Sequence, residues 1–190
     1  MAHAAILNAS IDLIREVGYD AVTMEGIAAR AGVGKATVYR RWSSKETLVA
    51  EALQQIMLAV PIPNSGSTRG DLQLIMGTTL KMYQDPATLA LLSGLVAAMA
   101  RSEMIATAMR SGFVATWRDA VRTLLERGMA RGDVRRDTDV QLAIDMLAAP
   151  MFYRFLITGA AIDEPLVRDV VELVMRALAP HEPNHSGGVR

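Results

Sequence analysis

Apolar side chains recur at every third or fourth position along nearly the whole chain, and this period restricts the fold more than any other feature. The first such run is Ile6, Ala9, Leu13 and Val17, which marks one face of an amphipathic helix. Gly18 then supplies the stop for this helix. No stretch shows the strict alternation of apolar and polar residues that is typical of a strand, so the sequence predicts an all-α protein.

Caps and glycines divide the residues that follow into short helices. Thr23 can cap a second helix that extends to Ala31, and Gly32 can take the left-handed conformation that ends it. A third helix is expected almost at once, over residues 35–42. Two short helices joined by a tight glycine turn are typical of a helix-turn-helix, which presents its second helix to the major groove of DNA.

A fourth helix and a break in the pattern follow this pair. Ser43 and Ser44 both offer caps for the fourth helix, and Glu46 can close a capping box with Ser43. The apolar period of this helix fades near Val60. Residues 61–70 then hold the turn-forming residues of a linker. The predicted division is an N-terminal domain of residues 1–60, a helical C-terminal domain of residues 61–180 and a flexible tail of residues 181–190. In the C-terminal domain the period predicts helices over 71–84, 86–100, 103–131, 138–157 and 165–178.

Composition excludes several classes of protein. The chain of 190 residues has 20 basic and 20 acidic side chains, so any surface for nucleic acid must be local. It has no cysteine, which excludes disulfides and thiolate sites and fits a reducing cytoplasm. The first residues lack a basic leader, and the longest weakly charged stretch, 86–100, is too short to cross a bilayer. We therefore expect a soluble cytoplasmic protein with no membrane partner.

A local basic surface is present where the helix-turn-helix is predicted. No acidic residue occurs between positions 30 and 45, and five cations do. This basic stripe consists of Arg30, Lys35, Arg40, Arg41 and Lys45. Phosphate groups are the natural partners of such a stripe, which favours binding to double-stranded DNA. The alternative is a solvated charged surface with no partner.

The same segment resembles a known family of regulators. Residues 32–48 read GVGKATVYRRWSSKETL, and residues 23–48 as a whole resemble the helix-turn-helix of the tetracycline repressor (TetR) family. The resemblance covers about the first 55 residues in motif terms, while the remainder is similar in size and helix order only. It implies a three-helix N-terminal domain in a protomer of about nine helices, dimerisation through the last two long helices and effector binding in the C-terminal body.

The resemblance also implies which residues contact DNA. Thr23 would contact phosphate, Tyr39 would hold the DNA backbone, and Lys35 would face the major groove. The full implied set is Thr23, Lys35, Ala36, Thr37, Tyr39, Arg40, Arg41 and Lys45. The sequence departs from the family at three positions. Arg40 and Arg41 stand where histidine and tyrosine are frequent, and Gly34 stands where serine is frequent. The resemblance therefore does not define which bases are read. Trp42 is expected to pack inward.

Methionine and aromatic residues gather in the C-terminal body. Methionine adapts its shape to irregular apolar ligands, so these residues could line a pocket for a small apolar or amphipathic effector. The candidate pocket residues are Met82, Met99, Phe113, Trp117, Met146, Met151 and Phe155. The competing explanation is that each of them fills the core.

Two wide apolar stripes lie near the C-terminus. They consist of Ile144, Leu147, Met151 and Phe155 in one helix and Leu166, Val170, Val171, Val174 and Leu178 in the next. A two-fold contact between protomers through residues 138–158 and 165–178 would bury both stripes, and burial inside the monomer is the alternative. Arg154 would then need a carbonyl or a carboxylate, for which Asp163 and Glu164 are candidates.

Other functional classes are disfavoured by particular residues. The letters of a zinc motif occur at residues 181–185, but Pro183 breaks the helix that the motif requires. Three histidines at the two ends of the chain cannot build a catalytic triad, and we expect no enzyme activity, metal or cofactor. A helical adaptor that binds only proteins stays open, although it would not need the basic stripe. The function predicted is a sequence-specific transcriptional regulator, a ligand-responsive repressor that binds a palindromic operator as a dimer.

Overall fold

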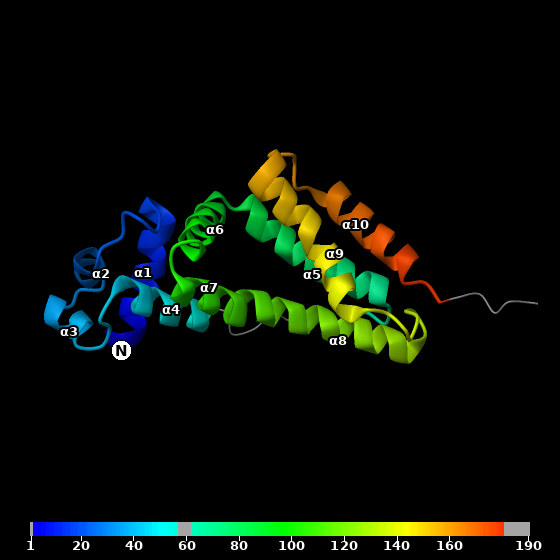
Figure 1. Cartoon of the computed structure of the whole chain (residues 1–190), viewed down its shortest axis with the longest axis horizontal. Helices are drawn as coiled ribbons and strands as arrows, with labels where there is room; N and C mark the ends of the chain where they lie inside the picture. Colours follow the sequence, from blue (N-terminus) through cyan, green and yellow to red (C-terminus); the bar gives the residue numbers. More distant parts are fainter. Residues whose placement is uncertain (1, 57–61, 181–190) are drawn as a thin grey trace, which may run out of the picture. The chain divides into compact units, whose positions relative to one another are not determined.

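The computed structural model describes residues 2–56 and 62–180, and these residues are helical with no strand among them (Figure 1). Two of the long helices contain a π-helical segment: α7, η1 and α8 follow one another without a break, as do α9 and η2. Counted as continuous helices, the described residues form nine. The predicted all-α class and the number of helices are therefore confirmed. The predictions for the tail, for its zinc-like motif and for the end of the fourth helix lie outside the described residues.

The described residues belong to two compact units. The first contains residues 2–56 and 81–119, and the second contains residues 62–80 and 120–180. The chain passes between the units at three places, one of which is the predicted boundary at residue 60. The division into an N-terminal and a C-terminal domain stays a prediction.

The first unit is built on α1 (Ala2–Val17). This helix packs against α2 (Met24–Arg30), α4 (Lys45–Ile56) and α6 (Pro86–Met99). Of the predicted apolar face, Ile6 and Ala9 are buried and Leu13 is half-buried, whereas Val17 at the end of the helix is 54% exposed. Gly18 ends the helix with a φ of +81°, a conformation that glycine adopts without strain. The unit also contains α3 (Lys35–Tyr39), α7 (Glu103–Met109) and η1 (Arg110–Val114).

Two sequence predictions for this unit are wrong in detail. α3 ends at Tyr39, before the predicted end at Trp42. The capping box at the start of α4 uses Ser44 and Thr47, not Ser43 and Glu46: the backbone N–H of Thr47 donates to Ser44 Oγ over 3.3 Å, and that of Ser44 donates to Thr47 Oγ1 over 3.2 Å. The helix starts at Lys45, so Ser44 is the residue directly before it and has the geometry that a cap requires.

The second unit contains α5 up to residue 80, α8 from residue 120, and the C-terminal helices. The bounds of these elements are α5 (Thr68–Gln84), α8 (Ala115–Arg131), α9 (Val140–Tyr153), η2 (Arg154–Thr158) and α10 (Glu164–Ala177). α9 and α10 pack against each other and bury the two predicted stripes except for Phe155, which is half-buried. Ile144, Leu147 and Met151 are at most 1% exposed, and Leu166, Val170, Val171, Val174 and Leu178 are also buried. These residues are therefore buried inside the monomer, which was the alternative to burial between two protomers.

The side of α9 and η2 away from this core keeps a separate apolar surface. Leu142, Met146, Tyr153 and Ile157 are 47–70% exposed, and Leu173 on α10 is 64% exposed. We call these five residues the outer apolar face. The four on α9 and η2 are spaced by four, seven and four positions, which places them on one side of the helix.

Val140–Thr158 is also long and apolar enough to cross a membrane, which the sequence analysis did not anticipate. Length and composition are the whole of this evidence. The core residues of α9 pack against α10 in the second unit, and 22% of the stretch is buried. Within the same stretch, Arg154 donates to the backbone carbonyl of Ala161, so a carbonyl rather than Asp163 is its partner. Asp163 instead caps α10 by accepting from the N–H of Leu166 over 3.0 Å.

A buried polar network holds the start of α5 against the end of α8. The Asp71 side chain is completely buried, accepts from the N–H of Ser65 over 2.6 Å and lies 3.7 Å from Nη2 of Arg131. Asp133 Oδ2 accepts from both the N–H and Oγ1 of Thr68 and from Nε of Arg131. These hydrogen bonds, the backbone N–H of Thr68 first, lower the pKa of Asp133.

This contact is close enough that only glycine fits beside it. A Cβ built on Gly128 would overlap Thr68 Oγ1 and lie 2.9 Å from Val134 Cγ2, and the network prevents Thr68 from moving away. We expect Gly128→Ala to lower the free energy of unfolding by about 1–3 kcal/mol in spite of the better helix propensity of alanine. Gly77→Ala, in α5, is the matched control because nothing lies within 4 Å of its Cβ position. Thermal and urea unfolding would contradict the prediction if both variants were equally stable.

Candidate nucleic-acid interface

α2 and α3 meet through a turn whose geometry follows from its glycines and caps. Thr23 caps α2, its Oγ1 accepting from the N–H of Gly26 over 3.0 Å. Gly32 has a φ of +68°, and the N–H of Val33 donates to the carbonyl of Ala28 over 3.0 Å. The chain therefore reverses within four residues and starts α3 at Lys35. This arrangement is the predicted helix-turn-helix.

Apolar residues on the inner side of the pair fix the position of α3. Ile27, Ala28 and Val38 are at most 1% exposed, and Val33 is half-buried. Trp42 is buried as predicted: its indole Nε1 donates to Glu51 Oε2 over 2.7 Å, and its ring stacks on His3 with centroids 5.3 Å apart. The small, closely packed contacts expected between the two helices are therefore present.

The predicted DNA contacts lie mostly on the surface of the first unit (Figure 1, α2 and α3). Six of them are exposed and two are half-buried. The exposed residues are Thr23, Lys35, Ala36, Tyr39, Arg40 and Arg41, and the half-buried ones are Thr37 and Lys45. Whether each of them contacts DNA stays a prediction.

The structure brings Lys35 and Tyr39 together on a residue that the sequence analysis missed. The hydroxyl of Tyr39 donates to Glu25 Oε1 over 3.2 Å, and Nζ of Lys35 lies 3.7 Å from the same oxygen. A backbone N–H hydrogen bond, followed by the Tyr39 hydroxyl, lowers the pKa of Glu25, so its carboxylate is ionised at neutral pH. The hydrogen bond between the Tyr39 hydroxyl and Glu25 also raises the pKa of Tyr39.

Other cations of the basic stripe also have partners inside the protein. Arg30 pairs with Glu16 on α1, and Nη1 of Arg41 lies 2.8 Å from Nδ1 of His3. Within the described residues, Arg40 is exposed and forms no ion pair or side-chain hydrogen bond. Because Glu16 and Glu25 lie outside positions 30–45, the absence of acids in that segment did not reveal these pairs.

Lys45 is bound differently from the other cations. Its Nζ donates to the carbonyl of Tyr19 over 2.9 Å, lies 3.4 Å from that of Asp20 and sits 4.5 Å from the centroid of the Tyr19 ring. Burial, with the charge of Glu46 second, raises the pKa of Tyr19 to about 12, so the ring is neutral and its face attracts the ammonium. Lys45 thus ties the start of α4 to the loop between α1 and α2.

The predicted pocket residues are divided between the two units. Met82, Met99, Phe113 and Trp117 belong to the first unit, and Met146, Met151 and Phe155 belong to the second. Trp117 and Met151 are buried, Met146 is exposed and the other four are half-buried. The assignment of these residues to an effector site stays a prediction.

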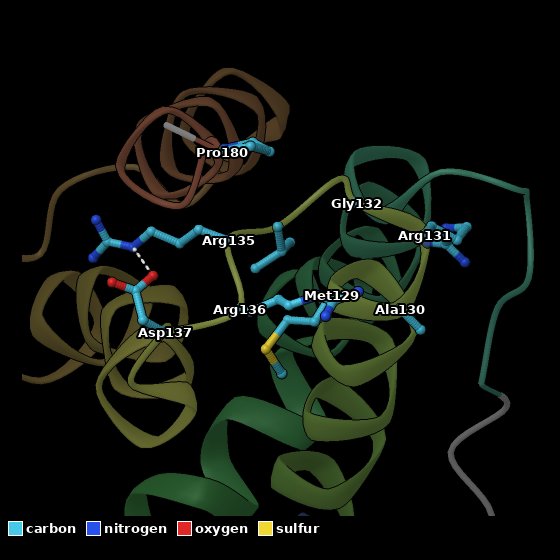
Figure 2. Close-up of a pocket in the computed structure, with 9 residues that line it drawn as sticks. Met129, Ala130, Arg131, Gly132, Arg135, Arg136, Asp137 and Pro180 are labelled. Atoms are coloured by element: carbon cyan, nitrogen blue, oxygen red, sulfur yellow. Dashed lines mark ion pairs between the residues drawn. The ribbon is translucent and has the colours of Figure 1, made fainter. Parts of the chain in front are cut away.

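Two hollows of the second unit have a defined lining. An open cleft of about 500 Å³ lies beside the end of α8 and Pro180 (Figure 2). Two of its three arginines are paired within the protein, Arg131 with Asp133 and Arg135 with Asp137. A smaller apolar hollow of about 200 Å³ lies between α9 and α10, and Met146 lines it together with Leu142 and Leu173. No group of three metal-binding side chains occurs among residues 2–56 and 62–180.

A helix-turn-helix with Lys35 exposed on its second helix and Arg40 and Arg41 exposed directly after it is typical of a DNA-binding protein, and comparison with known proteins narrows the class. Residues 6–52 match the family of bacterial regulatory proteins called the tetR family, and residues 62–174 match the Tetracyclin repressor-like C-terminal domain. The chain belongs to the TetR family of DNA-binding transcriptional regulators.

Individual relatives cover nearly the whole chain. The uncharacterised HTH-type transcriptional regulator YdeS of Bacillus subtilis is 36% identical over 170 residues, which are 89% of this chain and 85% of that protein. The DNA-binding transcriptional repressor TetR of Mycobacteroides abscessus is 30% identical over 178 residues, 92% of each chain. The crystal structure of the TetR family transcription regulator SCO0332 superposes with a TM-score of 0.72 at 28% identity and covers 94% of this chain and 99% of that one.

The different surroundings of two cations lead to a testable difference. We expect Lys45→Ala to lower the melting temperature, because it removes two hydrogen bonds to carbonyls and a cation–π contact worth roughly 1–2 kcal/mol together. Arg40→Ala removes an exposed side chain without an internal partner, so its melting temperature should match that of the wild type. Equal melting temperatures for both variants in a calorimetric scan would contradict the structural role of Lys45.

Proposed function

We propose that the chain is a homodimeric repressor that binds a palindromic operator and releases it when a small apolar or amphipathic molecule binds to the C-terminal body. The observation that carries this proposal is the exposed surface of α3, where Lys35, Ala36 and Tyr39 are exposed while Val38 is buried. Such a helix can enter the major groove while its partner helix contacts the backbone. Repression agrees with the name of the relative from Mycobacteroides abscessus.

We assign the DNA contacts to the residues that the family resemblance implies, and we assign Lys35, at the start of α3, to a phosphate at the edge of the major groove. Thr23 is the N-cap of α2 and is exposed. Arg40 and Arg41 directly follow α3, and both are exposed. Lys45 would reach DNA only at the expense of its contacts to Tyr19, so we expect it to contribute mainly by positioning α4.

Dimerisation is proposed through the outer apolar face. A contiguous exposed apolar surface on a helix pair is unfavourable in water and typical of an interface. The hollow between α9 and α10 lies within this face and offers a recess for a side chain of the second protomer. A two-fold axis through the pair would present two copies of α3 to successive major grooves.

The remaining parts of the proposal concern enzymatic activity, cofactors, localisation and effector binding. Its family consists of regulators, and we propose that it has no enzymatic activity, needs no cofactor or metal, acts in the cytoplasm and has no membrane partner. Effector binding in the C-terminal body is supported by the match of residues 62–174 to the tetracyclin repressor-like domain. The competing function, an adaptor for other proteins, would not require exposed cations on α3.

DNA binding is tested by titration of the purified protein against a duplex from the region upstream of its own gene, at several salt concentrations. We expect Lys35→Ala and Tyr39→Ala each to weaken binding by about tenfold, because each removes a hydrogen bond to a charged phosphate. Lys35→Ala should also lower the slope of log K against log salt by about one. Lys81→Ala is the matched control, since Lys81 is an exposed lysine outside the helix-turn-helix.

The result can refute the proposal clearly. Wild-type protein that binds no duplex at low salt, or variants at positions 35 and 39 that bind as tightly as the control, would exclude α3 as the recognition helix. The adaptor function would then be preferred.

The dimer is tested by sedimentation of variants that place a charge on the outer apolar face. We expect Leu142→Glu and Leu173→Glu to shift the protein to monomers, because a buried carboxylate without a partner costs several kcal/mol. Leu74→Glu is the control, because Leu74 is 56% exposed, as exposed as Leu142, but lies on α5. A wild-type monomer, or dimers of all three variants, would contradict the proposed interface.

A further inference from the structure

Glu25 lies between the two side chains that the proposed function assigns to DNA. One oxygen, Oε1, accepts from the Tyr39 hydroxyl over 3.2 Å and lies 3.7 Å from Lys35 Nζ. Both groups are therefore occupied by an internal anion in the protein without DNA. A phosphate oxygen has the same charge and the same acceptor character as this carboxylate oxygen.

The three side chains can exchange partners without unfolding. The side chains of Lys35 and Glu25 are 67% and 45% exposed, and Tyr39 is 49% exposed. An ion pair with this exposure is weak, because solvent screens it and both side chains lose freedom in forming it. Glu25 has a long flexible side chain in the first turn of α2 and can rotate into solvent when another anion arrives.

We propose that Glu25 acts as an internal substitute for DNA phosphate: it occupies Lys35 and Tyr39 in the free protein, and the DNA backbone displaces it. This inference rests on the proposed function. Each contact of Lys35 and Tyr39 with phosphate then replaces a contact with Glu25, so the net gain from binding is reduced. Because the exchange involves the backbone and not the bases, it lowers the affinity for all DNA sequences alike.

Removing the carboxylate should therefore strengthen DNA binding. We expect Glu25→Gln to lower the Kd about three- to fivefold at low salt, both for the upstream duplex and for an unrelated duplex of equal length. The matched control is Glu16→Gln, which removes the same charge from another exposed ion pair of the basic stripe, Arg30–Glu16. We expect this control to change the Kd less than twofold, and thermal unfolding should show that both variants are folded.

A second set of variants separates occupation of the donors from simple repulsion. Glu25→Gln is combined with Lys35→Ala and Tyr39→Phe, which remove both groups that Glu25 occupies. If Glu25 acts through these groups, its substitution should no longer change the Kd in this background. A gain that persists there would mean that the charge of Glu25 merely repels DNA, and the proposal would be overturned.

The other outcomes are equally decisive. An unchanged or raised Kd for Glu25→Gln, while wild-type protein binds the duplex, overturns this inference and leaves the proposed function intact. Equal gains for Glu25→Gln and Glu16→Gln show that only net charge matters and also overturn it. Wild-type protein that binds no DNA at low salt overturns the proposed function itself, and this inference with it.

Discussion

A helix of five residues has no stability of its own in water, so the position of α3 depends on the burial of Val38 and on the turn that precedes it. Val38 is completely buried, and Trp42, just beyond the helix, is held by Glu51 and His3. These anchors lie on the inner side of the helix and leave its outer side for polar and charged residues. The exposed side of α3 is therefore held in position only because a few apolar side chains fix a helix that could not form alone.

The sequence predicts the helices well because most of the information is local. Apolar period, glycine stops and caps such as Thr23 depend on neighbouring residues, and the structure confirms them. The end of α3 and the Ser43–Glu46 capping box were predicted wrongly, and of the two possible caps the structure uses Ser44, because several adjacent residues satisfy the same local rule and packing selects one of them. The π-helical segments η1 and η2 were not predicted, since one extra residue in a turn leaves no distinct pattern.

Contacts between distant residues explain what the sequence did not predict. Glu25 and Tyr39 are 14 positions apart and meet only because the turn at Gly32 folds α3 against α2. In the same way, the width of an apolar helix face indicates that partners exist but not whether they are intramolecular. The stripe of Ile144 and Leu147 is buried inside the monomer, and the exposed apolar residues Leu142 and Met146 lie on the opposite side of α9.

The balance of charge in the helix-turn-helix follows from these distant pairs. Counted along the sequence, the segment from 30 to 45 carries five cations and no acid, but in the folded protein Glu16, Glu25 and His3 lie beside three of those cations. DNA binding by such a surface exchanges internal partners for phosphates instead of adding contacts to bare cations. In the proposed function, the net affinity is then a small difference between two sets of polar and ionic contacts, so a modest change in geometry on effector binding would be sufficient to release DNA.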